Sequence, residues 1–375
     1  MTNKRKQQTC CGAGAEAKAG AEAAEGIGAG SAGADSSGSC CGGARSQTTR
    51  VVPQVSSEVS LRDRLGALRV RLGIGRMNYR VEPGLYAAGE PGDTAPVCVT
   101  ANYKMSFDLL RKALASYDAW ILVLDTRGVN VWCAAGKGSF GTEELIRQIE
   151  RSSIAKIVSR KRLILPQLGA PGVHAAQVTR RTGFGVSYGP VRAADLPFYF
   201  ERGWKKTEAM RTVEFPLAER LKLVPMEITG ALRYTLPLLA VALGIDLLTP
   251  LPGSGGAPAV TTAVLGAVLA GQGAVPLLLP YFPFRSFALK GAAAGIFWMA
   301  LYRLWYPLPV LSAAGIALVS TALAALLALG FTGATPFTSQ TATVREVHRV
   351  LPVGIAAFAG GAGMLVYSLV QGGVI

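Results

Sequence analysis

One cysteine, Cys133, lies in a stretch whose residue types could make its sulfur reactive. Asn130 precedes it and is a good helix N-cap, so the residues from Val131 to Lys137 are expected to form a short helix. Cys133 would then lie in the first turn, where unpaired backbone N–H groups favour a thiolate, and Lys137 would add positive charge on the same face. A thiolate at a ligand-binding edge acts as a nucleophile or as a ligand for a soft metal. The alternative for a lone cysteine is a small buried apolar residue, and the local pattern leaves both possibilities open.

Four further cysteines form two adjacent pairs near the start of the chain, Cys10-Cys11 and Cys40-Cys41. Both pairs lie within residues 1–50, a Gly-, Ala- and Ser-rich tail that we expect to be disordered. The pairs could trap a soft metal ion, or they are incidental thiols in a linker. Because the first residues are polar and no apolar segment follows them, we expect no secretory signal and therefore free thiols rather than disulfides.

Two phosphate-binding motifs are excluded by the residues around the cysteine. Gly136-Lys137 looks like the end of a phosphate loop, but that motif needs a glycine where Val131 stands and a serine or threonine where Gly138 stands. The Gly-x-Gly-x-x-Gly pattern of dinucleotide sites does not follow any of the expected strands. A nucleotide cofactor is therefore not supported, and the sequence also has no nucleic-acid-binding motif.

The cysteine-containing loop follows a strand in a regular alternation of strands and helices. The expected strands are 96–101, 119–126, 162–166 and 185–189, and the expected helices are 61–72, 106–116, 142–151, 173–181 and 193–201. Continuous apolar strands separated by helices predict a parallel sheet covered on both faces, with Cys98 as a structural residue inside a strand. Ligands bind at the carboxyl ends of the strands in such sheets, so the loops after Ala101, Thr126, Pro166 and Gly189 are the expected site.

The C-terminal part of the chain is apolar enough to lie in a membrane. Half of the 375 residues are hydrophobic and only 16% are charged, yet the net charge is +15, with the basic excess before residue 230. Five apolar stretches long enough to cross a bilayer follow, at about 231–249, 258–280, 284–304, 307–331 and 350–371. The positive charges alternate between the connections as they should if the N-terminal domain is cytoplasmic. We therefore expect a multi-pass protein of the cell (inner) membrane, with basic residues that face the membrane surface rather than nucleic acid.

Four segments of the strand–helix region resemble the corrinoid-binding domain of the corrinoid iron–sulfur proteins of acetyl-CoA synthesis. They are Thr100-Ala-Asn-Tyr-Lys-Met-Ser-Phe-Asp108, Asn130-Val-Trp-Cys-Ala-Ala-Gly-Lys137, Leu165-Pro-Gln-Leu-Gly-Ala-Pro-Gly172 and Tyr188-Gly-Pro-Val-Arg192. The Asn130–Lys137 string, attached to five apolar spans, is more similar to the mercury-methylating corrinoid proteins, the HgcA family. The four-cysteine cluster motif of the iron–sulfur proteins is absent, because the paired cysteines lack its spacing, and this favours the mercury-methylating branch.

This resemblance covers about residues 95–375 and implies a flavodoxin-like, Rossmann-like α/β domain that binds cobalamin, a cobalt corrinoid. The chain then divides into a disordered tail (1–50), a transition segment (51–95), the corrinoid-binding domain (96–205), a basic connector (206–230) and an all-α, five-helix transmembrane domain (231–375). Cys133 is implied as the lower axial ligand of cobalt. His174 and His348 are not in the Asp-x-His-x-x-Gly setting through which many cobalamin proteins ligate cobalt.

The resemblance also implies which residues face the corrin ring. They are Thr100, Asn102, Tyr103, Asn130, Val131, Trp132, Cys133, Ala134, Ala135, Gly136, Lys137, Gly138, Thr142, Gln167, Gly169, Gly172, Tyr188 and Gly189. Small side chains at Ala134, Ala135 and Gly136 are expected to let the helix backbone approach a flat ring closely. Trp132 has an alternative role as a core residue, since large aromatic side chains are usually buried.

The implied activity is that of a corrinoid-dependent methyltransferase, which passes the methyl group of methylcobalamin to inorganic Hg(II). A thiolate donates electrons to cobalt more strongly than an imidazole and should weaken the opposite cobalt–carbon bond. The implied partners are a ferredoxin-like iron–sulfur electron donor and a methyltetrahydrofolate-linked methyl donor.

Two other functions remain open at this point. One is a membrane-anchored corrinoid methyl carrier for one-carbon metabolism, as in the acetyl-CoA pathway. The other is a membrane transporter whose cytoplasmic domain senses a ligand, which rests on the five spans and on Asp246 in the first of them.

Overall fold

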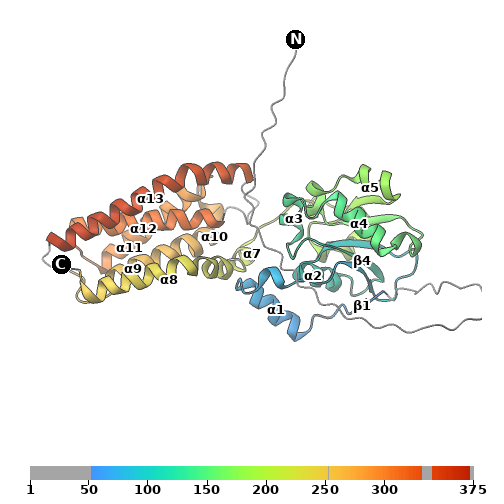
Figure 1. The fold of residues 1–375 in the computed structure, drawn as a ribbon, viewed down its shortest axis with the longest axis horizontal. Coiled ribbons are helices and arrows are strands. Elements are labelled where there is room, and N and C mark those ends of the chain that lie inside the picture. The colour runs from blue at the N-terminus through green and yellow to red at the C-terminus, as the bar shows by residue number, and fades with distance from the viewer. Residues whose placement is uncertain (1–51, 252, 332–339, 372–375) are drawn as a thin grey trace, which may run out of the picture. The chain divides into compact units, whose positions relative to one another are not determined.

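The computed structural model describes residues 52–251, 253–331 and 340–371. They form a mixed α/β domain followed by a region of long apolar helices (Figure 1). The predicted tail and its two cysteine pairs lie outside the described residues.

The α/β domain is built on a six-stranded sheet in the order β1-β2-β4-β3-β5-β6. The strands are β1 (Gln54–Val55), β2 (Gly84–Ala88), β3 (Val97–Ala101), β4 (Ala119–Leu124), β5 (Arg162–Leu165) and β6 (Gly185–Tyr188). The last four are the predicted strands, and they are parallel to one another. The other two come from the segment 51–95, and β2 runs antiparallel to β4, so the sheet is mixed instead of purely parallel.

Helices cover both faces of this sheet. They are α1 (Leu61–Arg71), α2 (Lys104–Ala113), α3 (Val131–Lys137), α4 (Thr142–Ser152), α5 (Ala175–Thr182) and α6 (Leu196–Glu201). Successive side chains of a strand point to opposite faces. Val99 of β3 accordingly packs in one core with Leu145 of α4 and Val178 of α5. Its neighbour Cys98 packs in a second core with residues of α2 and α6.

The strand order creates a crevice at one edge of the sheet. The chain passes from β3 to β4 on one side and then to β5 on the other side of β3, which is the order of doubly wound, flavodoxin-like sheets. The connections after β3 and β5 therefore diverge at the carboxyl edge, between the two strands. This crevice is the place where such sheets bind ligands.

A cluster of buried and half-buried charges joins α1 to α2. Asp63 of α1 lies 2.7 Å from the Lys104 ammonium and 2.8 Å from the Arg111 guanidinium. Asp108 bonds to the same two cations, at 2.6 and 2.7 Å. Burial disfavours the charged carboxylate, but hydrogen bonds from Lys104 and Ser60 hold the pKa of Asp63 well below its usual range. The cluster fixes the segment 56–71 on the sheet domain.

The C-terminal region consists of apolar helices. They are α7 (Leu217–Leu221), α8 (Val224–Leu248), α9 (Ala259–Leu269), a π-helical turn (Ala270–Ala274), α10 (Val275–Leu277), α11 (Phe287–Trp305), α12 (Val310–Gly330) and α13 (Gln340–Gln371). By length and composition, four helical segments among the described residues could cross a membrane: Leu217–Leu248, Ala259–Leu277, Val310–Gly330 and Ala342–Gln371.

The predicted five-span count is not confirmed, because α11 is not among those four. It is 19 residues long but carries Lys290 and Arg303. It packs closely on α12: a Cβ atom at Gly291 would come within 2.7 Å of Ala325 Cα, and one at Gly295 within 3.0 Å of Thr321 Cα. Small residues at such contacts let helices approach closely in apolar surroundings.

Asp246, the residue that suggested a transporter, has a structural role. Its carboxylate accepts hydrogen bonds from the backbone N–H groups of Val260 and Thr261, at 2.9 and 2.8 Å. These groups belong to the first turn of α9, where no intrahelical acceptor is available to them. Asp246 thus caps α9 from the end of α8.

Candidate functional site

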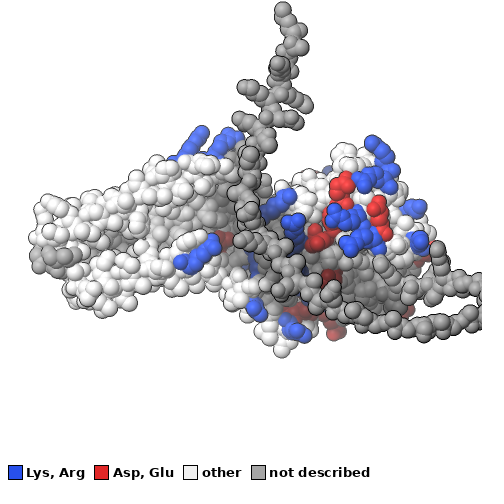
Figure 2. All heavy atoms as spheres, viewed as in Figure 1, with Lys and Arg blue, Asp and Glu red and all other residues white. Residues whose placement is uncertain are grey.

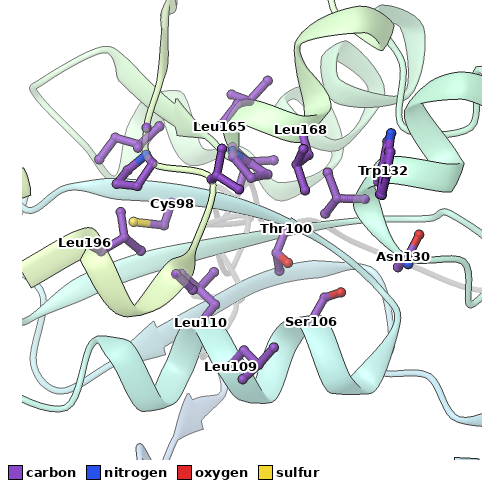
Figure 3. Close-up of a pocket in the computed structure, with 18 residues that line it drawn as sticks. Cys98, Thr100, Ser106, Leu109, Leu110, Asn130, Trp132, Leu165, Leu168 and Leu196 are labelled. Carbon is purple, nitrogen blue, oxygen red and sulfur yellow. The ribbon is translucent and has the colours of Figure 1, made fainter. Parts of the chain in front are cut away.

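A pocket of about 250 Å³ opens at the carboxyl ends of β3, β5 and β6. Its lining residues are mostly apolar: Cys98, Val99, Thr100, Ser106, Leu109, Leu110, Asn130, Val131, Trp132, Ile164, Leu165, Pro166, Leu168, Gly189, Pro190, Val191, Ala193 and Leu196. In Figure 3, side chains of α2 lie along one side of the pocket and Leu165 and Leu168 along the other, with Asn130 and Trp132 at one end. The pocket therefore lies where the strand order predicts a ligand.

Helix α3 forms as the sequence predicts and lies beside this pocket. The Asn130 side chain accepts a hydrogen bond from the backbone N–H of Cys133 at 3.0 Å, which caps the helix. Gly138 ends it with a φ of 80°, a left-handed conformation that favours glycine. The side chains divide between two environments: Val131, Ala134 and Ala135 are buried in the same core as the apolar residues of α4, whereas Trp132 is 37% exposed.

Cys133 is half-buried on α3, next to Trp132 in the chain. Its own side chain is not part of the pocket lining, although Asn130, Val131 and Trp132 are. Cys98, by contrast, is buried within the lining, and desolvation raises its thiol pKa to about 12. Cys98 therefore stays protonated at neutral pH and cannot act as a thiolate. Of the two described cysteines, Cys133 is the more exposed.

Asn102 was expected to face a ligand, but it is buried and organises the loop in front of α3. Its side-chain oxygen accepts hydrogen bonds from the backbone N–H groups of Thr126 (3.1 Å) and Gly128 (2.9 Å). Its amide nitrogen donates to Asp125 at 3.1 Å. The connection after β4 is thus held by a residue that follows β3. Gly128 has a φ of 75°, and a Cβ atom there would come within 2.5 Å of the Met77 carbonyl oxygen.

Replacing Asn102 by alanine is expected to lower the free energy of unfolding by about 2–4 kcal/mol, because two buried N–H groups lose their acceptor. Alkylation of Cys133 should become faster, since α3 is then less firmly held. Denaturation of the purified chain in detergent and peptide mass spectrometry after iodoacetamide treatment measure the two effects. Asn78→Ala, at an exposed asparagine, is the control. Unchanged stability and reactivity in Asn102→Ala would show that the loop does not depend on this residue.

Several of the expected ligand-facing residues turn out to pack against protein. A Cβ atom at Gly169 would come within 2.5 Å of the Phe140 ring, and one at Gly172 within 2.1 Å of the Phe140 carbonyl oxygen. These glycines belong to the 3-10 helix η3 (Gln167–Gly172) and allow it to lie closely against the end of α3. Ala134 and Ala135 face the core, and their small side chains allow close packing beneath α3.

The remaining expected residues are not part of the pocket lining. Lys137 and Gly136 are exposed on α3. Tyr103 is buried at the start of α2. The Thr142 hydroxyl accepts a hydrogen bond from His174 N at 2.8 Å, the Tyr188 hydroxyl donates to the Val173 carbonyl at 2.7 Å, and Gln167 accepts one from Lys206. Of the predicted set, the pocket brings together Thr100, Asn130, Val131, Trp132 and Gly189.

Sequence reasoning missed the wall that α2 contributes. Ser106, Leu109 and Leu110 line the pocket, and Leu109 is exposed. Helical periodicity marks α2 as amphipathic and assigns its apolar residues to the core. An apolar residue just outside that face, such as Leu109, is the only feature of the sequence that indicates that α2 also lines a pocket.

The described residues contain no group of three or more His, Cys, Asp and Glu side chains that could hold a metal ion. A bare ion bound by protein side chains needs several such ligands.

Comparison with known proteins relates the sheet domain to one family. Residues 71–198 match the family model of the CO dehydrogenase/acetyl-CoA synthase delta subunit. The chain is 33% identical over 129 residues to the acetyl-CoA decarbonylase/synthase complex subunit gamma of Methanopyrus kandleri, which is 34% of this chain and 28% of that protein. The same subunit of Archaeoglobus fulgidus is 30% identical over 135 residues, 36% of this chain and 28% of the relative. The gamma 2 subunit of Methanosarcina thermophila is 29% identical over 133 residues, with shares of 34% and 28%.

These matches confirm the resemblance to the corrinoid proteins of acetyl-CoA synthesis for the sheet domain. The chain spans little more than a quarter of the length of these relatives, and the match ends before the apolar helices. The more specific resemblance, to the mercury-methylating proteins, is not shown by them.

Proposed function

We propose that this chain is a membrane-anchored corrinoid protein, which binds cobalamin at the carboxyl edge of its sheet and carries a methyl group on the cobalt. The observation that supports this most is the position of the pocket. It lies at the switch point of a doubly wound sheet, beside the helix that carries Cys133, within the segment that matches the acetyl-CoA synthesis family. The sheet domain lies in the cytoplasm, and the apolar helices, five by our proposal, anchor it in the cell membrane.

The residues present fit such a cofactor. The pocket is apolar, and its rim carries the exposed side chains Leu109 and Trp132, so that a flat ring larger than the cavity can rest on the rim. Aromatic and aliphatic faces are the usual contacts of a large planar ligand. The corrin ring already chelates its cobalt, so the protein has to supply a single axial ligand at most.

Cys133 is the proposed lower axial ligand. It is the more exposed of the two described cysteines, and it lies on the helix whose first residues line the pocket. The two histidines are poorer candidates. His174 is exposed, and its Nδ1 accepts a hydrogen bond from Gln177 N at 3.3 Å at the start of α5, while His348 is exposed on α13. Neither lies on α3, the helix whose Val131 and Trp132 line the pocket.

We propose inorganic Hg(II) as the methyl acceptor. When bound, the cofactor supplies a methyl group that can leave with its bonding electrons, and a thiolate ligand promotes this departure by donating electrons to the metal. Hg(II) is a soft electrophile that accepts such a methyl group. The proposal rests on the resemblance of the Asn130–Lys137 string and on the thiol at position 133. Its proposed partners are a ferredoxin-like electron donor and a methyltetrahydrofolate-linked methyl donor.

A second candidate is a methyl carrier of one-carbon metabolism, and the comparisons favour it. The relatives are subunits of acetyl-CoA decarbonylase/synthase complexes, so a carrier that passes its methyl group to a partner protein agrees with them more directly than mercury methylation does. The two candidates share the cofactor and its site and differ only in the acceptor.

The test begins with cofactor binding by the full-length chain. The purified protein is incubated with methylcobalamin and freed of unbound corrinoid, and its visible spectrum is recorded. We expect stoichiometric retention in the native chain and several-fold weaker retention in Leu109→Arg, because a charged, bulky side chain at the exposed rim obstructs a flat ring. Failure of the native chain to retain any corrinoid would overturn both candidates.

The acceptor is then identified with the methyl-loaded protein. Methylmercury formed from Hg(II) faster than by free methylcobalamin supports the first candidate. Transfer only to a nickel- or carbon-centred acceptor supports the second.

A further inference from the structure

Helix α1 has one side that is docked on the sheet domain. Asp63 makes the ion pairs with α2, and its carbonyl oxygen accepts a hydrogen bond from the Tyr79 hydroxyl at 3.1 Å. Gly66 faces the Tyr79 ring so closely that a Cβ atom would come within 2.6 Å of the hydroxyl oxygen. Val70 is buried. The side of α1 that carries Asp63, Gly66 and Val70 is therefore held against the sheet domain.

The other side of α1 carries a row of exposed leucines. Leu61, Leu65 and Leu68, which we call the leucine ridge, are 72%, 57% and 52% exposed. Their spacing of four and three residues places them along one line of the helix. Ile74 and Met77, just after the helix, are also more than half exposed. Scattered single apolar residues are ordinary on a surface, but a contiguous row marks an interaction site.

Arginines flank the leucine ridge on both sides. At 100° per residue, Arg62 and Arg69 lie on one side of it and Arg64 and Arg71 on the other, and all four are exposed. Figure 2 shows basic side chains on the surface that α1 occupies in Figure 1. A shallow hollow of about 430 Å³ beside the ridge is lined by Arg62, Leu65 and Arg69, among others. The surface thus offers an apolar line between two rows of positive charge.

We propose that this side of α1 lies in the headgroup region of an anionic lipid bilayer, with the leucine ridge among the acyl chains and the four arginines on lipid phosphates. An interfacial helix has this arrangement, because long basic side chains can bury their stems and keep their charged ends at the phosphates. Anionic lipids complement the two rows of arginines. Four helical segments among the described residues are long and apolar enough to cross a membrane, and they would tether α1 to the bilayer that holds them. This second attachment holds the sheet domain at the membrane surface and does not depend on its cofactor.

Photocrosslinking of the full-length chain in lipid vesicles tests this proposal. A benzophenone amino acid is introduced in place of Leu65, and in a control chain in place of Phe198, which is 48% exposed on α6 of the same domain. The vesicles contain either phosphatidylcholine alone or phosphatidylcholine with phosphatidylglycerol. We expect a lipid adduct at position 65, at least about fivefold more abundant than at position 198, and more of it in the vesicles with anionic lipid.

A variant with Arg62, Arg64, Arg69 and Arg71 replaced by glutamine should lose most of the adduct in the anionic vesicles. Equal lipid adducts at positions 65 and 198 would overturn the proposal. Adducts of position 65 with a protein would also overturn it, and they would identify the leucine ridge as a contact with another chain or with another part of this one. The comparison between the two lipid mixtures needs no arginine substitution, so a variant that fails to fold does not affect it.

Discussion

Replacing Cys133 by alanine is expected to slow methyl transfer to Hg(II) at least about a hundredfold, since even residues that only support a metal ligand typically contribute 10–100-fold. The folded state should change little. Cys133 is half-buried, its backbone rather than its side chain bonds to Asn130, and alanine has a higher helix propensity. We expect a change in the free energy of unfolding within about 0.5 kcal/mol. Slower methyl transfer would therefore reflect the missing sulfur atom and not a destabilised fold.

The visible spectrum of the cobalamin-loaded protein checks the assignment independently of turnover. The native chain should show a sulfur-ligated cobalt spectrum, which Cys133→Ala should lose while it still retains corrinoid through the pocket. The matched control replaces Cys10, Cys11, Cys40 and Cys41 by serine and leaves Cys133 in place. It should keep the native spectrum. A Cys133→Ala protein with native spectrum and native transfer rate would rule out Cys133 as the ligand.

The second large effect is expected at Arg111, whose replacement by methionine should lower the free energy of unfolding by about 3–5 kcal/mol. Arg111 is buried, and it bonds to Asp108 at 2.7 Å and Asp63 at 2.8 Å. It also donates to the carbonyl oxygens of Ser56 and Glu58. Methionine has a similar length but cannot bond to any of them, so Lys104 is left as the one cation that pairs with the two carboxylates. Thermal or denaturant unfolding in detergent measures the loss.

The control for this variant is Arg181→Met, which removes a surface ion pair with Glu143. The two side chains are 45% and 64% exposed, and exposed pairs contribute less than about 1 kcal/mol. Equal losses in the two variants would mean that the buried cluster is no more important than an ordinary surface pair.

Acid should weaken the same cluster. The pKa of Asp63 is lower in the folded protein than its unfolded value of 3.8, so its stabilising contribution is present above that pH and is lost as the pH falls below it. The native chain should therefore lose stability on acidification below pH 4, and Arg111→Met, which has already lost part of the cluster, should lose less.

The parts of the fold that have strong local signals could be predicted from the sequence. Strand β4 is a continuous apolar run, β3 and β5 are mostly apolar, and α3 is marked by the Asn130 cap and by Gly138. The strands β1 and β2 could not be found in this way. β1 has two residues, and β2, Gly84–Ala88, lies among turn-forming residues and owes its place to pairing with β4, a contact that is distant in the sequence.

The sequence predicted the position of the pocket and part of its lining, but not the contacts of every residue assigned to the site. Asn130 and Trp132 line the pocket as expected, because strand order and the loop after β4 place them at its edge. The roles of Asn102 and Gly172 could not be read from their residue types. An asparagine that holds a loop and one that contacts a ligand look the same in a sequence, and a glycine beside a ring looks the same as a glycine beside Phe140.

The hydrogen bonds of Asn102 determine how the loop after β4 could be transferred to another protein. The segment after β4 carries the proposed ligand, but its shape is enforced by an amide on the neighbouring strand connection. If residues 125–138 alone were transplanted into a different doubly wound scaffold, the backbone N–H groups of Thr126 and Gly128 would lose the Asn102 oxygen that holds them. A designer would have to graft both connections as one unit, and natural recombination would meet the same requirement.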